Sequence, residues 1–258
     1  TLEIRLLMAA DPKGITHETI VRDVRAGKIA PVYYLMGEEP YYIDRVSEFL
    51  VQTLIKPEER DFNLDVVYGA DVTINRVIEL AQAYPMMADR RVVLVREAQM
   101  MRSLEGLEQY VQHHTPSTVL ILCHKHGTLD KRKPAYKAIQ QMGVLYESRR
   151  MQDYQLPSFI SSYIKRGKAE IESSAAQMLA EHVGNDLCRL SAEMDKQAKL
   201  ANKESFSGRT TWGISFEIIT HSLLFSSLIS PLGNSWSYDY FRPTGNGQLP
   251  PLFRPTNR

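Results

Sequence analysis

The sequence predicts an α/β protein with a mostly parallel sheet, helices on both faces of the sheet and a small helical domain after it. Two observations support this prediction. Up to residue 147, short apolar runs alternate five times with segments of helical periodicity, which is the pattern of βαβ units. After Arg149, three helical stripes follow one another without a strand between them. The predicted strands cover 31–37, 62–68, 91–96, 118–123 and 144–147.

The intervening helices are predicted from apolar residues that recur every three or four positions. Proline is favoured in the first turn of a helix, so Pro40 marks the start of one helix. Glycine is favoured just after the end of a helix, so Gly27 marks the end of another. We expect helices over about 16–26, 40–54, 74–81, 103–111 and 133–141, and the three later ones over 156–164, 175–183 and 187–194.

These patterns divide the chain into four expected parts. Residues 16–148 form the α/β domain and residues 149–200 the small helical domain. Residues 1–15 show no clear element and are expected to be a disordered or non-native start. Residues 201–258 are rich in Ser, Gly and Pro and hold only five Lys/Arg and three Asp/Glu, so we expect a disordered or non-native tail.

Composition narrows the class of protein. Apolar residues make up 43% and charged residues 24%, as in ordinary soluble domains, and the net charge of +1 does not indicate a nucleic-acid binder. No run approaches the ~18 apolar residues of a transmembrane helix. Two cysteines, Cys123 and Cys188, form no disulfide framework and suit a reducing compartment. We therefore expect a cytoplasmic protein with no membrane partner.

The turn after the first predicted strand is where an α/β nucleotide-binding protein would hold phosphate. A P-loop places G-x-x-x-x-G-K-[ST] there, so that backbone N–H groups and a lysine surround the anion. Here Gly37 is followed by Glu38, Glu39 and Pro40, without a lysine. The two carboxylates favour a helix N-terminus by themselves and would repel a triphosphate. We expect Gly37, Glu38 and Glu39 to form a degenerate turn that binds no phosphate, and we expect no cofactor.

Metal and nucleophile chemistry find little support. His124 and His126 alternate on a strand, so a two-histidine metal site is one alternative. No carboxylate or cysteine motif completes such a site, so we expect solvated loop histidines and no metal. Cys123 lies in an apolar strand, where a buried thiol is inert. No residue is assigned a catalytic role.

Two basic clusters are candidates for DNA contact. Clusters of this kind either touch phosphates or form a solvated face, and the second is more common. The candidates are Lys131, Arg132 and Lys133, and the pair Arg149 and Arg150.

The segment between the 74–81 helix and the 91–96 strand is unusual for a loop. Tyr84, Pro85, Met86 and Met87 are apolar at a place where a connection is normally polar. Two alternatives follow from the residues alone. Either one or both methionines are exposed as an adaptable binding surface, or both tuck under the edge of the sheet.

Three segments then carry a resemblance to a known family. They are PVYYLMGEEPYYID at 31–44, AYPMMADRRVVLVREA at 83–98 and GNDLCRL at 184–190. In this order and spacing they resemble the delta subunit of the bacterial DNA polymerase III clamp loader, in its Bacteroidetes-like form, over about residues 16–196.

The resemblance implies an AAA+-like α/β domain without a functional P-loop, a helical lid domain and a C-terminal helical collar. It also implies a replication protein that binds the sliding clamp (the beta subunit) and helps to open it for loading onto primed DNA. Such a protein has no intrinsic activity and is a subunit of a DNA-directed DNA polymerase holoenzyme, a nucleotidyltransferase. The resemblance stops near residue 195, so we expect a truncated or frameshifted C-terminus without the collar. The collar would join the tau/gamma and delta prime subunits.

The resemblance also implies a site. In the family, two adjacent large apolar residues before the third strand insert into a pocket of the clamp, and the matching positions are Met86 and Met87, with Tyr84 and Pro85 beside them. The usual pair is Leu-Phe or similar, so Met-Met keeps the apolar character and gives up the aromatic ring. Two other functions stay open as alternatives: an AAA+-type nucleotide hydrolase, and a DNA-binding module that uses the basic clusters.

Overall fold

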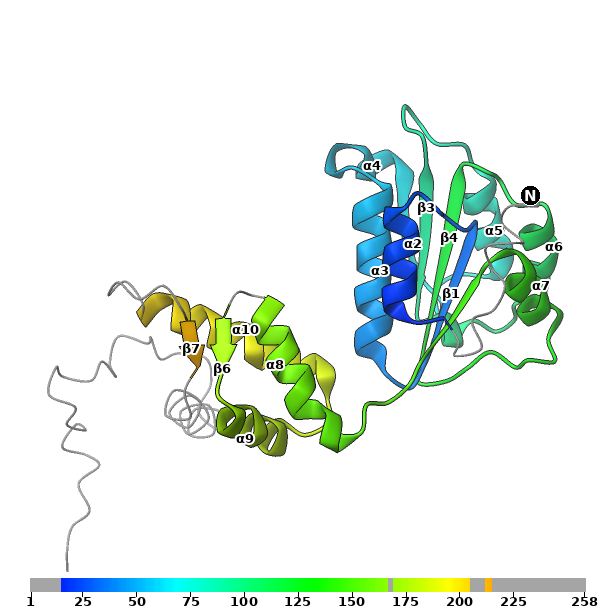
Figure 1. Ribbon diagram of the computed structural model, residues 1–258. Coiled ribbons are helices and arrows are strands. Elements are labelled where there is room, and N and C mark those ends of the chain that lie inside the picture. The colour runs from blue at the N-terminus through cyan, green and yellow to red at the C-terminus, as the bar shows by residue number, and fades with distance from the viewer. Residues whose placement is uncertain (1–14, 167–168, 205–211, 215–258) are drawn as a thin grey trace, which may run out of the picture.

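A computed structural model describes residues 15–166, 169–204 and 212–214 of the chain, and the predictions for a disordered start and for most of the tail lie outside these residues. In the described part, a parallel five-stranded sheet with helices on both faces is followed by three helices (Figure 1). The predicted fold class is therefore confirmed.

The strands of the sheet lie in the order β2-β3-β4-β1-β5, and every neighbouring pair is parallel. The chain moves outward from β1 to β2, returns through β3 to β4, and then crosses to β5 on the other side of β1. The direction of winding thus reverses between β1 and β4, which is where open α/β sheets usually form their sites. The strands are β1 (Val32–Gly37), β2 (Leu64–Tyr68), β3 (Arg91–Arg96), β4 (Thr118–Lys125) and β5 (Val144–Ser148).

Helices cover both faces of the sheet because its central strands are apolar on both sides. On one face α2 (His17–Arg25) and α3 (Pro40–Leu54) bury Ile20, Ile43 and Leu50 against β1, β3 and β4 (Figure 1). The opposite face is covered by α5 (Ile74–Gln82), α6 (Leu107–Gln112) and α7 (Pro134–Met142). Between α3 and β2 lie a 3-10 turn (Pro57–Glu59) and the one-turn helix α4 (Arg60–Asn63).

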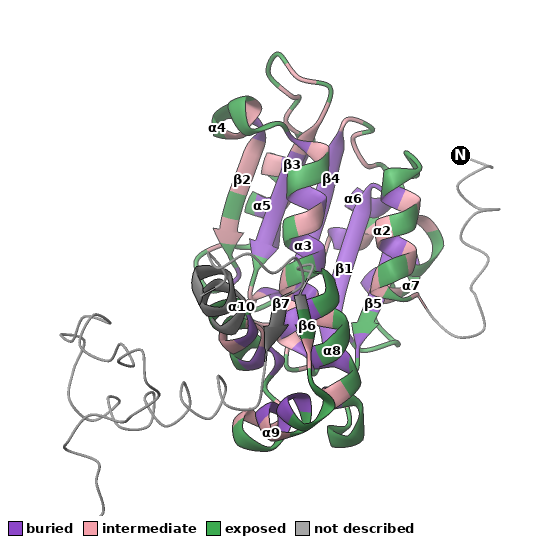
Figure 2. Cartoon of the chain, turned by 60° about the vertical axis from the view of Figure 1, so that its left-hand side comes forward, coloured by how far each residue is buried: buried purple, intermediate pink, exposed green. Residues whose placement is uncertain are grey.

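A third apolar cluster forms the helical part after β5. It is built from α8 (Leu156–Arg166), α9 (Ser173–Val183) and α10 (Leu187–Glu204). The start of α3 joins it: Tyr41 is buried here and meets the Phe159 ring edge-on at 5.8 Å, and Tyr42 packs partly buried beside it. The buried residues of this cluster are distinct from those under the sheet (Figure 2). The boundaries proposed for the domains remain predictions.

Three expectations about elements were wrong. The helix expected over 103–111 begins only at Leu107, because Gly106 has a left-handed φ of 94° that no helix continues through. The strand expected from residue 62 begins at Leu64, because residues 60–63 turn as α4. The part after Arg149 is not purely helical: β6 (Ala169–Ile171) pairs with β7 (Trp212–Ile214). Three residues are too few for an alternating pattern to be visible in a sequence.

Among the described residues, no helix is long and apolar enough to cross a membrane.

Candidate functional site

The connection between α5 and β3, residues 83–90, exposes the apolar residues that its sequence contains; we call it the methionine loop. Tyr84 is 81% exposed, Met86 58% and Met87 98%. Of the two alternatives for this segment, burial of both methionines under the sheet is therefore wrong. The loop lies at the edge of the sheet where β2 and β3 begin, which is the edge away from α8 and α9 (Figure 2).

The methionine loop is held by a side chain from another segment. Asn63, at the end of α4, accepts a hydrogen bond from the Met86 N–H at 2.7 Å and donates one to the Met86 carbonyl at 2.9 Å. Its amide also donates to the Glu59 carbonyl at 3.2 Å. Met87 then adopts a φ of 52°, in the left-handed region that costs a residue with a Cβ about 1 kcal/mol. The loop thus has a defined backbone although its side chains are exposed.

A second tie joins α4 to the strand that follows the loop. Arg91 of β3 donates from Nη1 to the Phe62 carbonyl at 3.0 Å and forms an ion pair with Asp65 of β2. Phe62 is itself 62% exposed. The sequence analysis gave Asn63 and Arg91 no role. Asn63 bonds Met86 across 23 residues and Arg91 bonds Phe62 across 29, and no local pattern marks such contacts.

The backbone N–H groups of the turn after β1 donate hydrogen bonds to other groups of the protein. The Gly37 N–H donates to the Gly127 carbonyl at 2.8 Å and the Glu38 N–H to the Ser148 carbonyl at 3.1 Å. Pro40 has no N–H, and the Tyr41 N–H is capped by the Glu39 carboxylate at 3.2 Å. A P-loop needs these donors free, because they must face the phosphates.

The turn after β1 is also tightly packed. Glu39 is only 4% exposed, and burial raises the pKa of its carboxyl, with the nearby Asp186 acting in the same direction. Gly37 has a φ of 133°, and a Cβ there would lie 2.1 Å from the Ser148 carbonyl oxygen. The space beside the turn is thus filled by β5.

The crossover between β1 and β4 is closed by a small ion network. Lys125, the last residue of β4, pairs with Asp44 of α3 at 2.9 Å and with Glu97 after β3 at 3.5 Å. Gln99 bonds both the Glu97 carboxylate and the Lys125 N–H. These groups satisfy one another at the point where other α/β proteins hold ligands.

The prediction for His124 is wrong, whereas the burial predicted for Cys123 is observed. His124 is not a solvated loop histidine: it lies within β4, half-buried, with its Nδ1 2.8 Å from the Tyr34 hydroxyl, and burial lowers its pKa. The strand continues to Lys125, two residues beyond the predicted end, which accounts for the error. His126 is exposed. Cys123 is buried, and burial raises the pKa of its thiol to about 12, as expected for an inert cysteine. The described residues contain no group of three or more potential metal ligands.

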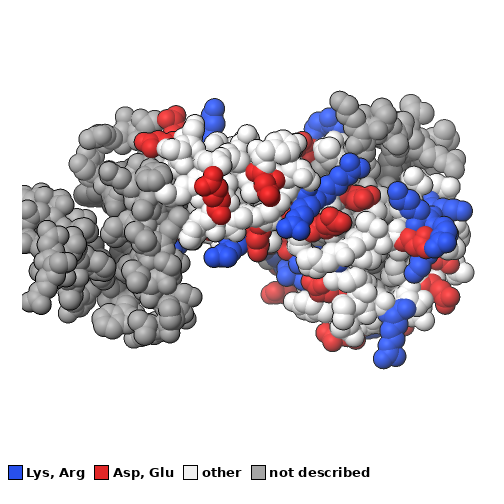
Figure 3. Space-filling model, turned by 90° about the horizontal axis from the view of Figure 1, so that it is seen from below, with Lys and Arg blue, Asp and Glu red and all other residues white. Residues whose placement is uncertain are grey.

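The candidate DNA-contacting residues, Lys131, Arg132, Lys133, Arg149 and Arg150, are all exposed. One of them is already paired: Arg132 contacts Asp130 at 2.9 Å and its hydrogen bonds lower the pKa of that carboxyl to about 2. On the face seen in Figure 3, basic and acidic side chains are interspersed over the described surface. That face therefore carries no continuous basic stripe of the kind that tracks a nucleic-acid backbone.

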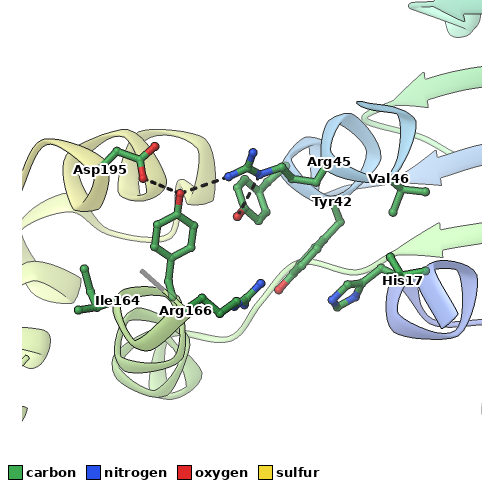
Figure 4. A pocket seen from close by; sticks show the side chains of 10 residues that line it. His17, Tyr42, Arg45, Val46, Ile164, Arg166 and Asp195 are labelled. Atoms are coloured by element: carbon green, nitrogen blue, oxygen red, sulfur yellow. Dashed lines mark hydrogen bonds between the residues drawn. The ribbon is translucent and has the colours of Figure 1, made fainter. Parts of the chain in front are cut away.

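A cleft of about 430 Å³ lies between the α/β part and the helical part (Figure 4). The Tyr163 hydroxyl of α8 accepts a hydrogen bond from Arg45 of α3 at 3.2 Å and donates one to Asp195 of α10 at 2.8 Å. On the other wall, His17 stacks on Tyr42 at 4.7 Å. These polar side chains already contact one another across the cleft, so it joins the two parts of the chain.

Comparison with known proteins relates part of this chain to a known family. The profile of the delta subunit of DNA polymerase III matches residues 33–148, which run from β1 to the end of β5. Over these residues the chain is similar to the delta subunits of DNA polymerase III. The methionine loop and Asn63 both lie inside this stretch.

Relatives support the same family. The DNA polymerase III subunit delta of Bacillus subtilis (strain 168) is 26% identical over 185 residues, which cover 68% of this chain and 53% of that protein. The chain thus spans about half the length of this curated relative.

Solved structures match the delta fold and more distant folds. The Bacillus subtilis DNA clamp loader delta protein superposes with a TM-score of 0.62 at 23% identity, covering 80% of this chain and 62% of that one. The Thermotoga maritima RuvB Holliday junction branch migration motor superposes with a TM-score of 0.51 at 13% identity, covering 87% of this chain and 69% of that one. At these identities the likeness concerns the fold.

Proposed function

We propose that this delta-family chain binds the ring-shaped sliding clamp through Tyr84, Pro85, Met86 and Met87 and helps to open it for loading onto primed DNA. The observation that carries the proposal is the 98% exposure of Met87. The resemblance of the 83–98 segment to the family implies that this position inserts into the clamp. A fully exposed methionine contributes nothing to the folding core. Its apolar surface is available to a partner instead.

The energetics suit a small, strong contact. Full burial of a methionine is worth ~1.5–3 kcal/mol, so the pair supplies up to ~6 kcal/mol before ordering costs. The backbone of the loop is fixed in advance by Asn63, which reduces those costs. Two adjacent side chains are then enough for a binding hot spot.

Clamp opening follows from differential binding. A subunit that binds the edge of an open ring better than a closed ring shifts the population toward the open form by that difference in free energy. No bond is made or broken by this chain in such a step.

We also propose that the chain does not hydrolyse ATP and leaves that reaction to other loader subunits. The support is the turn after β1, where Gly37 and Glu38 donate their N–H groups to protein carbonyls and Glu39 caps α3. Contact with the other loader subunits remains a prediction. So does contact with primed DNA inside such a complex by Lys131, Arg132, Lys133, Arg149 and Arg150.

The test is clamp binding by the purified chain, measured by surface plasmon resonance or calorimetry with the sliding clamp of the same organism. We expect the Met86→Ala/Met87→Ala double variant to bind at least ~30-fold more weakly, because it removes most of the contact area. Met100→Ala is the matched control: Met100 is 60% exposed but follows β3 rather than preceding it, and its loss should leave affinity unchanged.

Equal affinity of wild type and double variant would refute the assignment of the site. ATP turnover by the same preparation would favour the nucleotide hydrolase instead. Tight duplex-DNA binding that weakens steeply with salt, in the absence of the clamp, would favour the DNA-binding module.

A further inference from the structure

Asn63 is a buried polar residue whose hydrogen bonds all go to the backbone of other residues. It is 1% exposed, and its side-chain amide makes a two-way contact with Met86, accepting from the N–H and donating to the carbonyl. A neighbouring strand would engage a residue in the same way, through both its N–H and its C=O. Asn63 therefore holds Met86 as a strand would, although the loop belongs to no strand.

The methionine loop has few other means of being held. It connects α5 to β3 without regular structure, and its largest side chains face outward, so burial of those side chains does not fix it. Met87 also occupies a left-handed conformation that relaxes unless its neighbours are fixed. Two hydrogen bonds from a buried amide to the preceding residue supply that restraint.

Asn63 also ties a third apolar side chain to this surface. Phe62 precedes it in the chain and is 62% exposed, and the Phe62 carbonyl accepts from Arg91 at the far end of the loop. Phe62 and the methionine loop are thus joined on both sides, once through Asn63 and once through Arg91. They lie at the same end of the sheet, the end where α4 is seen in Figure 2.

We infer that Asn63 is a positioning residue for the Met86–Met87 pair and that it brings Phe62 into the same apolar protein-binding surface. The inference rests on the proposed clamp binding and adds to it two residues that the loop sequence does not contain. In physical terms, Asn63 lowers the ordering cost of binding, and Phe62 enlarges the buried area.

Variants of Asn63 test the positioning role. We expect Asn63→Ala to weaken binding of the sliding clamp about tenfold or more, because the free loop must then be ordered on binding. Hydrogen exchange of the Met86 amide should accelerate in the free protein, a change that loss of a contact to the clamp would not cause. Asn63→Asp, which keeps the acceptor for Met86 but loses the donors, should weaken binding in the same direction and serves if Asn63→Ala does not fold.

Ser148→Ala is the matched control for lost stability. Ser148 is also buried and bonds a backbone carbonyl, that of Met36, but at the opposite end of the sheet. It should destabilise the domain to a similar extent and leave clamp affinity unchanged. For Phe62, we expect Phe62→Ala to weaken binding severalfold, and Tyr154→Ala, which removes a 79% exposed ring in the helical part, to have no effect.

The outcomes separate this inference from the proposed function. Wild-type affinity in Asn63→Ala and Asn63→Asp, while the methionine double variant loses binding, would overturn the positioning role and leave the clamp site intact. Equal affinity of Phe62→Ala and Tyr154→Ala would remove Phe62 from the surface. A wild-type chain that does not bind the clamp at all would overturn the proposed function and this inference with it.

Discussion

At the residue scale, Met87, the proposed binding side chain, departs from the rules that build a core. It is nearly fully exposed, and its backbone is left-handed although it is not glycine. Both features cost or forgo folding stability, and neither is compensated by a contact of its own side chain. Such a combination is typical of residues kept for a partner.

The cost can be measured by substitution. We expect Met87→Gly to raise the free energy of unfolding by up to ~1 kcal/mol over Met87→Ala, because glycine adopts a φ of 52° without strain whereas alanine does not. The gain is partly offset by the greater entropy of glycine in the unfolded chain. Urea unfolding of the two variants and the wild type is the measurement.

Clamp binding is expected not to follow the stability of these variants. Both lack the methionine side chain, so both should bind more weakly than wild type whatever their stability. If the glycine and alanine variants unfold at the same urea concentration, no strain is stored at Met87.

At the scale of single elements, the start of α3 makes contacts within the protein at the place where a P-loop protein binds phosphate. Glu39 caps its first turn, Tyr41 packs into the helical cluster and Asp44 pairs with Lys125. The start of one helix thereby contacts the turn after β1, the helical part and the end of β4. The helix N-terminus has a carboxylate from its own chain where a P-loop protein has a phosphate.

A pH dependence follows from Glu39. Burial raises the pKa of this carboxyl, so the folded state holds a proton that the unfolded state releases first. The stabilising contribution is therefore present below the unfolded pKa of about 4.3 and is lost as the pH rises through the folded pKa. Glu39→Gln keeps an acceptor for the Tyr41 N–H but does not titrate.

We expect Glu39→Gln to gain stability relative to wild type as the pH rises from 4 to 7. Unfolding in urea across this range gives the comparison, and Glu38→Gln, at an exposed neighbouring position, is the control. A wild-type minus variant difference that stays constant with pH would show that Glu39 does not titrate differently on folding.

At the scale of the whole molecule, the proposed clamp surface and the cleft with the helical part lie at opposite ends of the sheet. The proposed clamp surface lies where β2 and β3 begin (Figure 2). The cleft with the helical part is lined by the first turns of α3, which follows the end of β1. The cleft is crossed by the Arg45–Tyr163–Asp195 hydrogen bonds. Burial raises the pKa of the Tyr163 hydroxyl to about 12, so it remains a donor at neutral pH.

This separation predicts independent effects. We expect Tyr163→Phe to cost ~1 kcal/mol of stability, because the Arg45 and Asp195 side chains lose a shared partner, and to increase proteolytic cleavage between β5 and α8. Clamp affinity of the isolated chain should not change. A loss of affinity comparable to that of the methionine variants would show that the two ends are coupled.

The sequence by itself determined the alternation of strands and helices, the lack of a lysine in the turn at Gly37–Glu39 and the apolar character of Met86 and Met87. These features are local: they are read from periodicity within one element or from residue types at one turn. The short β6 and β7 pairing and the burial of His124 were missed, since each depends on a partner distant in the chain.

Only the tertiary structure decided whether the methionines are buried or exposed. Local pattern left both alternatives open, because the burial of a connecting segment depends on what packs against the edge of the sheet. Asn63 reaches Met86 across 23 residues, and Arg91 reaches Phe62 across 29. Hydrogen bonds of this range depend on the pairing of β2 with β3, which brings their partners together, and they give the apolar loop a defined backbone.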